Sequence, residues 1–132
     1  MRRGKMKQGL VEGQTVTLEI KVTPDMFAQF DGKIVHRAYS TVSMIYHMEW
    51  ASRQIILPFL EEHEEGMGGA VQAKHLFPTP EGATLTITAQ LCKYEENSIL
   101  TQVTVKNGET LVGIGEVKQI ILPKSKISSL LA

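Results

Sequence analysis

The sequence predicts an α+β fold in which an antiparallel β-sheet wraps around one long α-helix. Three observations carry this prediction: one strand-like run near the start, one helical run over 40–60, and four strand-like runs after it. Helix and sheet each have an apolar face to bury, and a sheet curved around a single helix buries both.

The first strand is predicted over 15–22, where apolar and polar residues alternate. One face of this run is apolar throughout: Val16, Leu18, Ile20 and Val22. Such a period of two is typical of a strand with one buried face. A Thr-Pro pair then interrupts the pattern, and Asp25 is placed to begin a short turn of helix through Phe27 and Phe30. Asp31-Gly32 predicts a turn.

Residues 40–60 are predicted to form the long helix. Apolar or small side chains recur there at spacings of four, three and four: Met44, Met48, Ala51 and Ile55. These spacings follow the helical repeat, and further apolar residues flank them, so the helix is expected to be buried on most sides. Ser40 or Thr41 is expected to cap its start, and Pro58 to end or kink its last turn.

A charged, glycine-rich loop is expected over 61–69. Four strands should follow it, over about 70–77, 83–93, 98–106 and 110–122. In the second of them one face is apolar: Leu85, Ile87, Ala89 and Leu91. Asn107-Gly108 predicts a tight hairpin turn, because both residues adopt positive φ readily. Gly113 and Gly115 predict a bulge or the close approach of another backbone. This element order is that of the hotdog fold; a cystatin-like sheet with one helix is the structural alternative.

Composition limits the classes of function. Residues 1–132 are expected to form one domain with flexible tails over 1–8 and 124–132. Lys and Arg number 14, as do Asp and Glu, so the net charge of zero argues against nucleic-acid binding. No apolar run follows the basic start, and none is long enough to span a membrane, so we expect a cytoplasmic protein. The single Cys92 excludes an internal disulfide, and the four scattered histidines predict no metal site.

Three polar residues are candidates for chemistry. Glu49 is the only acidic residue between Ala38 and Leu60, and a carboxylate on a buried helix is costly unless it is paired or protonated. An ordinary i to i+4 ion pair with Arg53 would equally explain it. His75 lies where a predicted strand meets a loop, which is a frequent place for function, although a structural histidine is the alternative.

The third candidate is Thr41, whose simplest role is a helix N-cap. A helix N-terminus also presents free N–H groups and partial positive charge, which suit a developing oxyanion. Gly68 and Gly69 could expose backbone donors in the same way, or form only a flexible turn. The other three histidines are interpreted as structural or solvated. The residues alone are therefore compatible with acyl transfer or hydrolysis without requiring either.

Two segments resemble the fluoroacetyl-CoA thioesterase family. The first runs from Thr41 through the Met-Glu-Trp-Ala sequence at 48–51 and resembles the family's central helix. The second, over 67–75 with Thr79-Pro80 and Gly82, matches the family's next strand in spacing. The similarity covers roughly residues 9 to 122. It implies a hotdog homodimer, with a tetramer as the alternative assembly, whose active sites lie at the subunit interface.

The resemblance also implies roles for residues. Thr41, Glu49 and His75 correspond to the family's catalytic set, and Gly68 to a contact for the thioester carbonyl. The implied reaction is hydrolysis of a small or medium acyl-CoA, with CoA as part of the substrate and no cofactor. The family's aromatic lid aligns poorly with this sequence, and only Phe27 or Phe30 could form it here. Lys74 or Lys118 is the candidate contact for the CoA phosphates. A non-catalytic acyl-CoA binding or sensing module is the alternative function.

Overall fold

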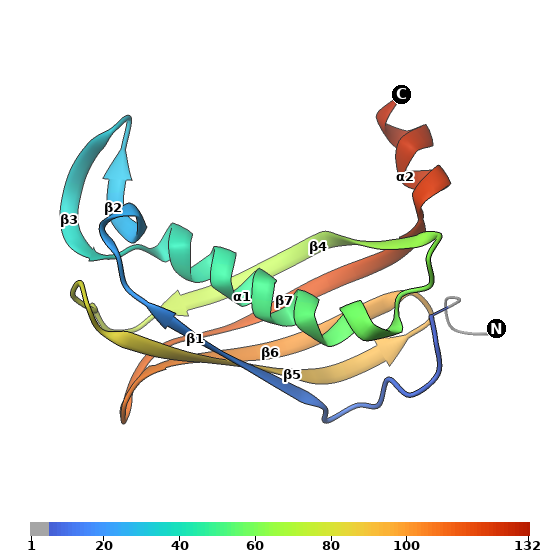
Figure 1. Cartoon of the computed structure of the whole chain (residues 1–132), viewed down its shortest axis with the longest axis horizontal. Helices are drawn as coiled ribbons and strands as arrows, with labels where there is room; N and C mark the ends of the chain where they lie inside the picture. The colour runs from blue at the N-terminus through green and yellow to red at the C-terminus, as the bar shows by residue number, and fades with distance from the viewer. Residues whose placement is uncertain (1–5) are drawn as a thin grey trace.

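A computed structural model describes residues 6–132 as a curved five-stranded antiparallel sheet with one long helix across its face (Figure 1). The strand order is β1-β5-β6-β7-β4, and every pairing is antiparallel. The sheet consists of β1 (Thr15–Lys21), β4 (Glu64–His75), β5 (Thr84–Glu95), β6 (Ser98–Asn107) and β7 (Thr110–Pro123). The helix is α1 (Thr41–Ile56), which a 3-10 turn, η2 (Leu57–Phe59), extends. This is the predicted hotdog architecture.

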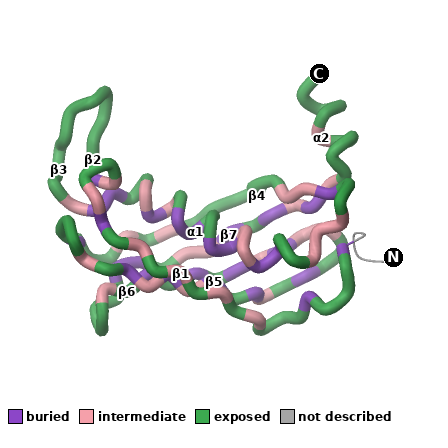
Figure 2. Tube along the Cα trace, viewed as in Figure 1, coloured by how far each residue is buried: buried purple, intermediate pink, exposed green. Residues whose placement is uncertain are grey.

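The core lies between α1 and the concave face of the sheet. The predicted helical positions Met44, Met48, Ala51 and Ile55 are at most 3% exposed. They meet the predicted apolar face of β5, Leu85, Ile87, Ala89 and Leu91, which is at most 1% exposed. The buried parts of helix and strands face each other in Figure 2. Burying each large apolar side chain contributes on the order of 1.5–3 kcal/mol, so this contact dominates the stability of the fold.

The start of α1 resolves the two capping candidates. Ser40 is the N-cap, and its Oγ accepts a hydrogen bond from the Ser43 N–H at 3.0 Å. Thr41 is the first helical residue, so its hydroxyl is available for another partner. Pro58 lies in η2, directly after the helix, where a residue without an N–H is tolerated.

Gly113 and Gly115 lie where α1 crosses β7, and the predicted close approach is confirmed. A Cβ on Gly115 would lie 2.7 Å from the Gln72 backbone oxygen of β4 and 2.8 Å from Met48 Sδ. A Cβ on Gly113 would overlap Met44 Sδ. The two glycines therefore allow the helix to sit close to the sheet, beside the strand that ends at His75.

Two segments differ from prediction. The glycine-rich residues 61–69 were expected to be a loop, but β4 begins at Glu64 and pairs with β7, with a bulge between Gly68 and Ala70. The expected turn of helix through Phe30 ends at Met26 as η1 (Pro24–Met26), and β2 (Phe27–Phe30) and β3 (Lys33–Tyr39) then form a hairpin. At 64–69 hydrogen bonding to β7 outweighs weak local strand propensity, whereas β2 and β3 pair with each other across the predicted Asp31-Gly32 turn.

The two segments predicted to be flexible tails contain a helix or contacts with the rest of the chain. Met6 is 8% exposed, and the Lys7 N–H donates to the Phe59 carbonyl at 2.7 Å, so both lie against the body of the protein. Residues 1–5 lie outside the described part of the chain. At the other end, α2 (Lys124–Leu131) is helical but buries no residue and extends away from the sheet (Figure 1). The flexibility of both tails stays a prediction.

None of the helices within residues 6–132 has the length and apolar character needed to cross a membrane.

Candidate active site

The structure brings two of the three candidate residues into contact. Thr41 Oγ1 lies 2.8 Å from His75 Nδ1, although 34 residues separate them. Thr41 is at the start of α1 and His75 is the last residue of β4, so the helix end and the strand end meet here. The second ring nitrogen, Nε2, is buried and has no hydrogen-bond partner among the described residues.

Burial lowers the pKa of His75 below its ordinary value of 6.5, because a charged imidazole is poorly solvated there. The Phe77 backbone raises this pKa more weakly than burial lowers it, although none of its atoms is in hydrogen-bonding geometry with Nε2. His75 is therefore neutral near pH 7. In the tautomer that carries its proton on Nε2, its Nδ1 accepts the Thr41 hydroxyl proton, as a general base requires.

A hollow of about 530 Å³ opens beside this pair. Its walls come from the β2–β3 hairpin, the start of α1 and the residues after β4. They are mostly apolar or small side chains, with two histidines, and comprise Ala28, His36, Ala38, Tyr39, Ser40, Thr41, His75, Leu76, Phe77 and Pro78. His36, which was expected in a loop, lies in β3. An apolar hollow with a few polar groups at one end suits an acyl group attached to a reactive carbonyl.

Glu49 occupies a different place on the same helix. Eight residues separate it from Thr41, which is about 12 Å along the axis at 1.5 Å per residue. Its Oε1 would lie 3.2 Å from a Cβ on Gly68, so the carboxylate rests against the bare backbone of β4. The alternative pairing of Glu49 with Arg53 is not observed, because Arg53 binds Glu65 at 2.7 Å instead. Glu49 is exposed, so it pays no large desolvation cost in the single chain.

Glu49 and Gly68 line a second hollow of about 420 Å³, with Tyr46, Trp50, Arg53, Gly66, Val117 and Gln119. Thr41 and His75 do not belong to it. One chain therefore contains two separate groups of candidate residues, Thr41 with His75 and Glu49 with Gly68, and each group is called a half-site below. The triad implied by the family resemblance is not assembled within a single chain.

The remaining candidate residues lie elsewhere. A Cβ on Gly69 would meet Ile120 and the Lys118 carbonyl instead of Glu49. Phe30 is 67% exposed on the β2–β3 hairpin and lines neither half-site, and Phe27 is buried at 2%. The roles of Gly69 and Phe30 in substrate binding stay predictions.

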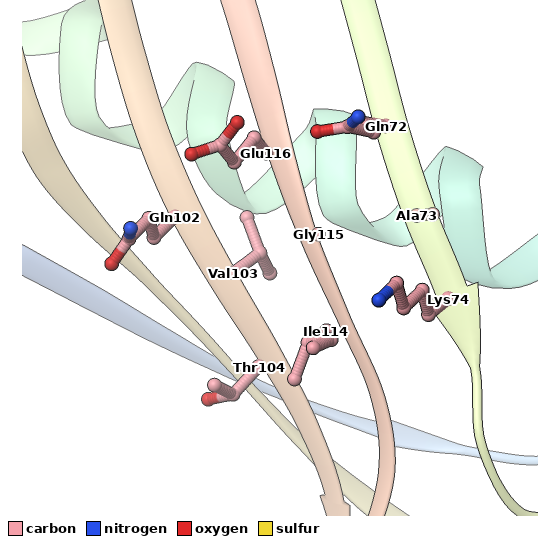
Figure 3. Close-up of a pocket in the computed structure, with 9 residues that line it drawn as sticks. All are labelled: Gln72, Ala73, Lys74, Gln102, Val103, Thr104, Ile114, Gly115 and Glu116. Carbon is pink, nitrogen blue, oxygen red and sulfur yellow. The ribbon is translucent and has the colours of Figure 1, made fainter.

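Lys74 lies on the outer face of the sheet, away from α1 (Figure 3). It borders a third hollow of about 540 Å³ there, together with Gln72, Glu116 and neighbouring residues of β6 and β7. Lys118 follows Ile114 and Glu116 in the alternation of β7, so it lies on the same outer face. Contact of either lysine with the CoA phosphates stays a prediction, since neither lines a half-site.

Tyr39, which packs between the helix and His75, was not among the candidates predicted from the sequence. Its strand, β3, was not recognised because residues 33–39 show no clean alternation. His47, interpreted as structural or solvated, is 4% exposed and bonds Tyr39. Within residues 6–132, no three side chains of His, Cys, Asp or Glu gather closely enough to hold a metal ion.

Comparison with known proteins identifies the family of the chain. The family model described as fluoroacetyl-CoA-specific thioesterase matches residues 22–125. A fluoroacetyl-CoA thioesterase from Streptantibioticus cattleyicolor is 27% identical over 135 residues, covering 94% of each chain.

Solved structures are similar over nearly the whole chain. A thioesterase superfamily member from Thermus thermophilus is 40% identical with a TM-score of 0.88, covering 94% of this chain and 92% of that one. A variant of a fluoroacetyl-CoA-specific thioesterase in complex with fluoroacetate and CoA is 25% identical with a TM-score of 0.83, covering 89% and 98%. The chain is therefore a thioester hydrolase, and it belongs to the fluoroacetyl-CoA-specific thioesterase family.

Proposed function

We propose that the protein hydrolyses a small or medium acyl-CoA to the free acid and CoA, in sites that two subunits share. The observation that carries this proposal is the Thr41–His75 hydrogen bond beside an apolar hollow. The separation of this pair from Glu49 and Gly68 on the same chain supports a site completed by a second subunit. The relative crystallised with fluoroacetate and CoA supports a CoA thioester as the substrate class.

The surface beside β4 supports a homodimer. β4 is an edge strand of 12 residues, and its outer backbone groups are a template for another strand. Next to it, α1 exposes an apolar stripe at helical spacing: Val42 at 69%, Tyr46 at 63% and Trp50 at 42%. An exposed apolar stripe beside an open strand edge is typical of a protein–protein interface.

Two-fold symmetry would complete the site. If the β4 strands of two copies pair antiparallel, the His75 end of one strand lies beside the glycine-rich part of the other. Glu49 and Gly68 of one subunit then face Thr41 and His75 of its partner. Each dimer would contain two such sites, each built from both chains.

The chemistry follows from these positions. The thioester carbonyl would lie near Gly68 and the start of α1, where backbone N–H groups and the helix dipole favour negative charge. His75, neutral near pH 7, acts as general acid and base. Glu49 either directs a water molecule or forms a transient acyl-enzyme, and Thr41 is the third candidate nucleophile. Glu49 desolvated by the partner subunit would gain reactivity that it lacks in water.

The first test is release of free thiol from acyl-CoAs between acetyl and lauroyl, with Glu49→Ala and His75→Ala as paired variants. We expect turnover on some chain length and its loss in both variants. No thiol release from any acyl-CoA, with binding measured by calorimetry, would instead indicate an acyl-CoA binding module. A monomer in sedimentation at micromolar concentration would contradict the shared site.

Mixing the two variants tests the sharing directly. In a mixed dimer, the intact Thr41 and His75 of the Glu49→Ala chain face the intact Glu49 of the other chain, so one site of two is complete. Equal mixing makes about half of the dimers mixed, so about a quarter of the original activity should return. If each site lay within one chain, every site would carry one substitution and no activity would return.

A further inference from the structure

A buried tyrosine–histidine pair lies next to the Thr41–His75 half-site. The Tyr39 hydroxyl is 2.6 Å from His47 Nδ1, and the two rings stack with centroids 5.7 Å apart and an interplanar angle of 3°. Tyr39 is 2% exposed and His47 is 4% exposed. Tyr39 comes from the end of β3 and His47 from the second turn of α1, so the pair ties the hairpin to the helix.

The direction of this hydrogen bond follows from burial. Burial raises the pKa of Tyr39 far above its ordinary value, so the phenol keeps its proton. Burial also lowers the pKa of His47, with Asp25 acting more weakly in the opposite direction, so the imidazole is neutral. The Tyr39 hydroxyl therefore donates to an unprotonated Nδ1, and both groups satisfy each other without a buried charge.

The same tyrosine ring contacts His75. The two rings are nearly perpendicular, at 77°, with centroids 6.2 Å apart. The His75 imidazole has one side-chain hydrogen bond, in which Nδ1 accepts from the Thr41 hydroxyl, and its buried Nε2 has no partner among the described residues. A single hydrogen bond does not determine the rotation of an imidazole ring, whereas packing against a second rigid ring restricts it.

Tyr39 is itself held at both ends. Its N–H donates to the Thr79 carbonyl at 2.8 Å, and its hydroxyl is held by His47. A ring fixed at backbone and hydroxyl is a rigid surface for the imidazole to rest against.

We propose that Tyr39 and His47 are positioning residues, which hold the imidazole of His75 in the orientation that bonds Thr41. This inference rests on the proposed function for the catalytic role of His75. His47 lines neither half-site hollow, and its hydrogen bond to Tyr39 is the contact that leads to His75. Its ring also lies near Tyr46 and Trp50, which line the Glu49 hollow, so the readouts below are chosen to report on His75 itself.

The test replaces the acceptor that holds the tyrosine. His47→Leu leaves the Tyr39 hydroxyl unpaired, and we expect kcat to fall about 5- to 10-fold, the equivalent of one hydrogen bond, with KM for acyl-CoA unchanged. His47→Asn places an amide oxygen near the position of Nδ1 and should restore most of kcat. Where His47→Leu does not fold, the double variant with Tyr39→Phe leaves no buried polar atom unpaired and carries the same test.

A matched control separates positioning from stability. Ser52 lies on the same helix, is fully buried, and its Oγ is 2.6 Å from Thr101 Oγ1. Ser52→Ala therefore removes a buried hydrogen bond of the same length. We expect it to lower the free energy of unfolding as His47→Leu does, but to leave kcat unchanged.

Two further measurements test whether the effect of His47→Leu depends on His75. In a His75→Ala background, His47→Leu should cause no additional loss of the residual rate. In the single variant His47→Leu, the imidazole NMR resonances of His75 should shift or broaden, while those of the exposed His63 should not. Unchanged kcat and unchanged His75 resonances in a folded variant would overturn the proposal. If His75→Ala keeps full thiol release, the proposed function is wrong. The His75 resonances in His47→Leu would then still show whether Tyr39 and His47 hold the imidazole in place.

Discussion

Gly115→Ala should destabilise the protein through a backbone contact. The new Cβ would lie 2.7 Å from the Gln72 carbonyl oxygen and 2.8 Å from Met48 Sδ, both well inside ordinary contact distance. Met48 can change rotamer, but the Gln72 oxygen moves only if β4 moves. Overpacking of this kind costs about 1–3 kcal/mol, so we expect a loss near 2 kcal/mol.

Urea denaturation measures this loss. With a slope of about 2 kcal/mol per M, the midpoint should fall by about 1 M without a change of slope. Because β4 ends at His75, thiol release should fall as well. Gly113→Ala is the matched comparison: its overlap is with the Met44 side chain, and the nearest backbone atom, the Lys74 oxygen, is 3.1 Å away. An unchanged midpoint in Gly115→Ala, or a larger loss in Gly113→Ala, would refute this reasoning.

Three other expectations follow from single contacts. Ser40→Ala removes the N-cap of α1 and should cost about 1 kcal/mol in urea denaturation, whereas Ser40→Asp, which keeps an acceptor, should cost much less. Glu65→Ala should cost less than about 1 kcal/mol, because both partners of the Arg53–Glu65 pair are more than a third exposed. The Arg53 hydrogen bond lowers the pKa of Glu65 from 4.5, so this contribution is present above about pH 4.5 and is lost as pH falls from there through the lowered pKa; a cost of Glu65→Ala that grew as pH fell would contradict the assignment. Burial lowers the pKa of His75 from 6.5, so the base form persists to lower pH than for a free imidazole, and kcat/KM should drop with a midpoint below pH 6.5; a drop centred above 6.5 would mean that another group titrates.

The candidate site was predictable only in part. Spacing along the helix does place Glu49 away from Thr41, but no local pattern indicates that His75 meets the Thr41 hydroxyl 34 residues away. That pairing came from resemblance to a family, and the structure supplies its geometry. The alternative interpretation of Glu49 as an ion-pair partner of Arg53 is not observed, because Arg53 instead reaches a carboxylate on β4 that sequence spacing does not bring near it.

The errors in the fold share one cause. Residues 64–69 have a glycine-rich sequence with low strand propensity, yet they extend β4 because β7 provides hydrogen-bond partners along its length. Likewise, β3 has no clean alternation, since its side chains are exposed up to Ala38 and only Tyr39 is buried. A strand that forms because neighbouring strands pair with it, and not because one face is buried, shows no clear alternation of apolar and polar residues.

The sequence by itself determined the buried stripe of α1 and the apolar face of β5, because each depends on residues close together in the chain. It also indicated the hairpin after β6, although the two turn residues are Gly108 and Glu109, one position later than predicted, and Gly108 alone of them has a positive φ. Only the tertiary structure decided which residues meet across elements: Thr41 with His75, Tyr39 with His47, and Glu49 with Gly68. Local periodicity records which side of an element faces the core. Contacts between distant residues depend on how the helix lies across the sheet, and close approach at Gly113 and Gly115 sets that position.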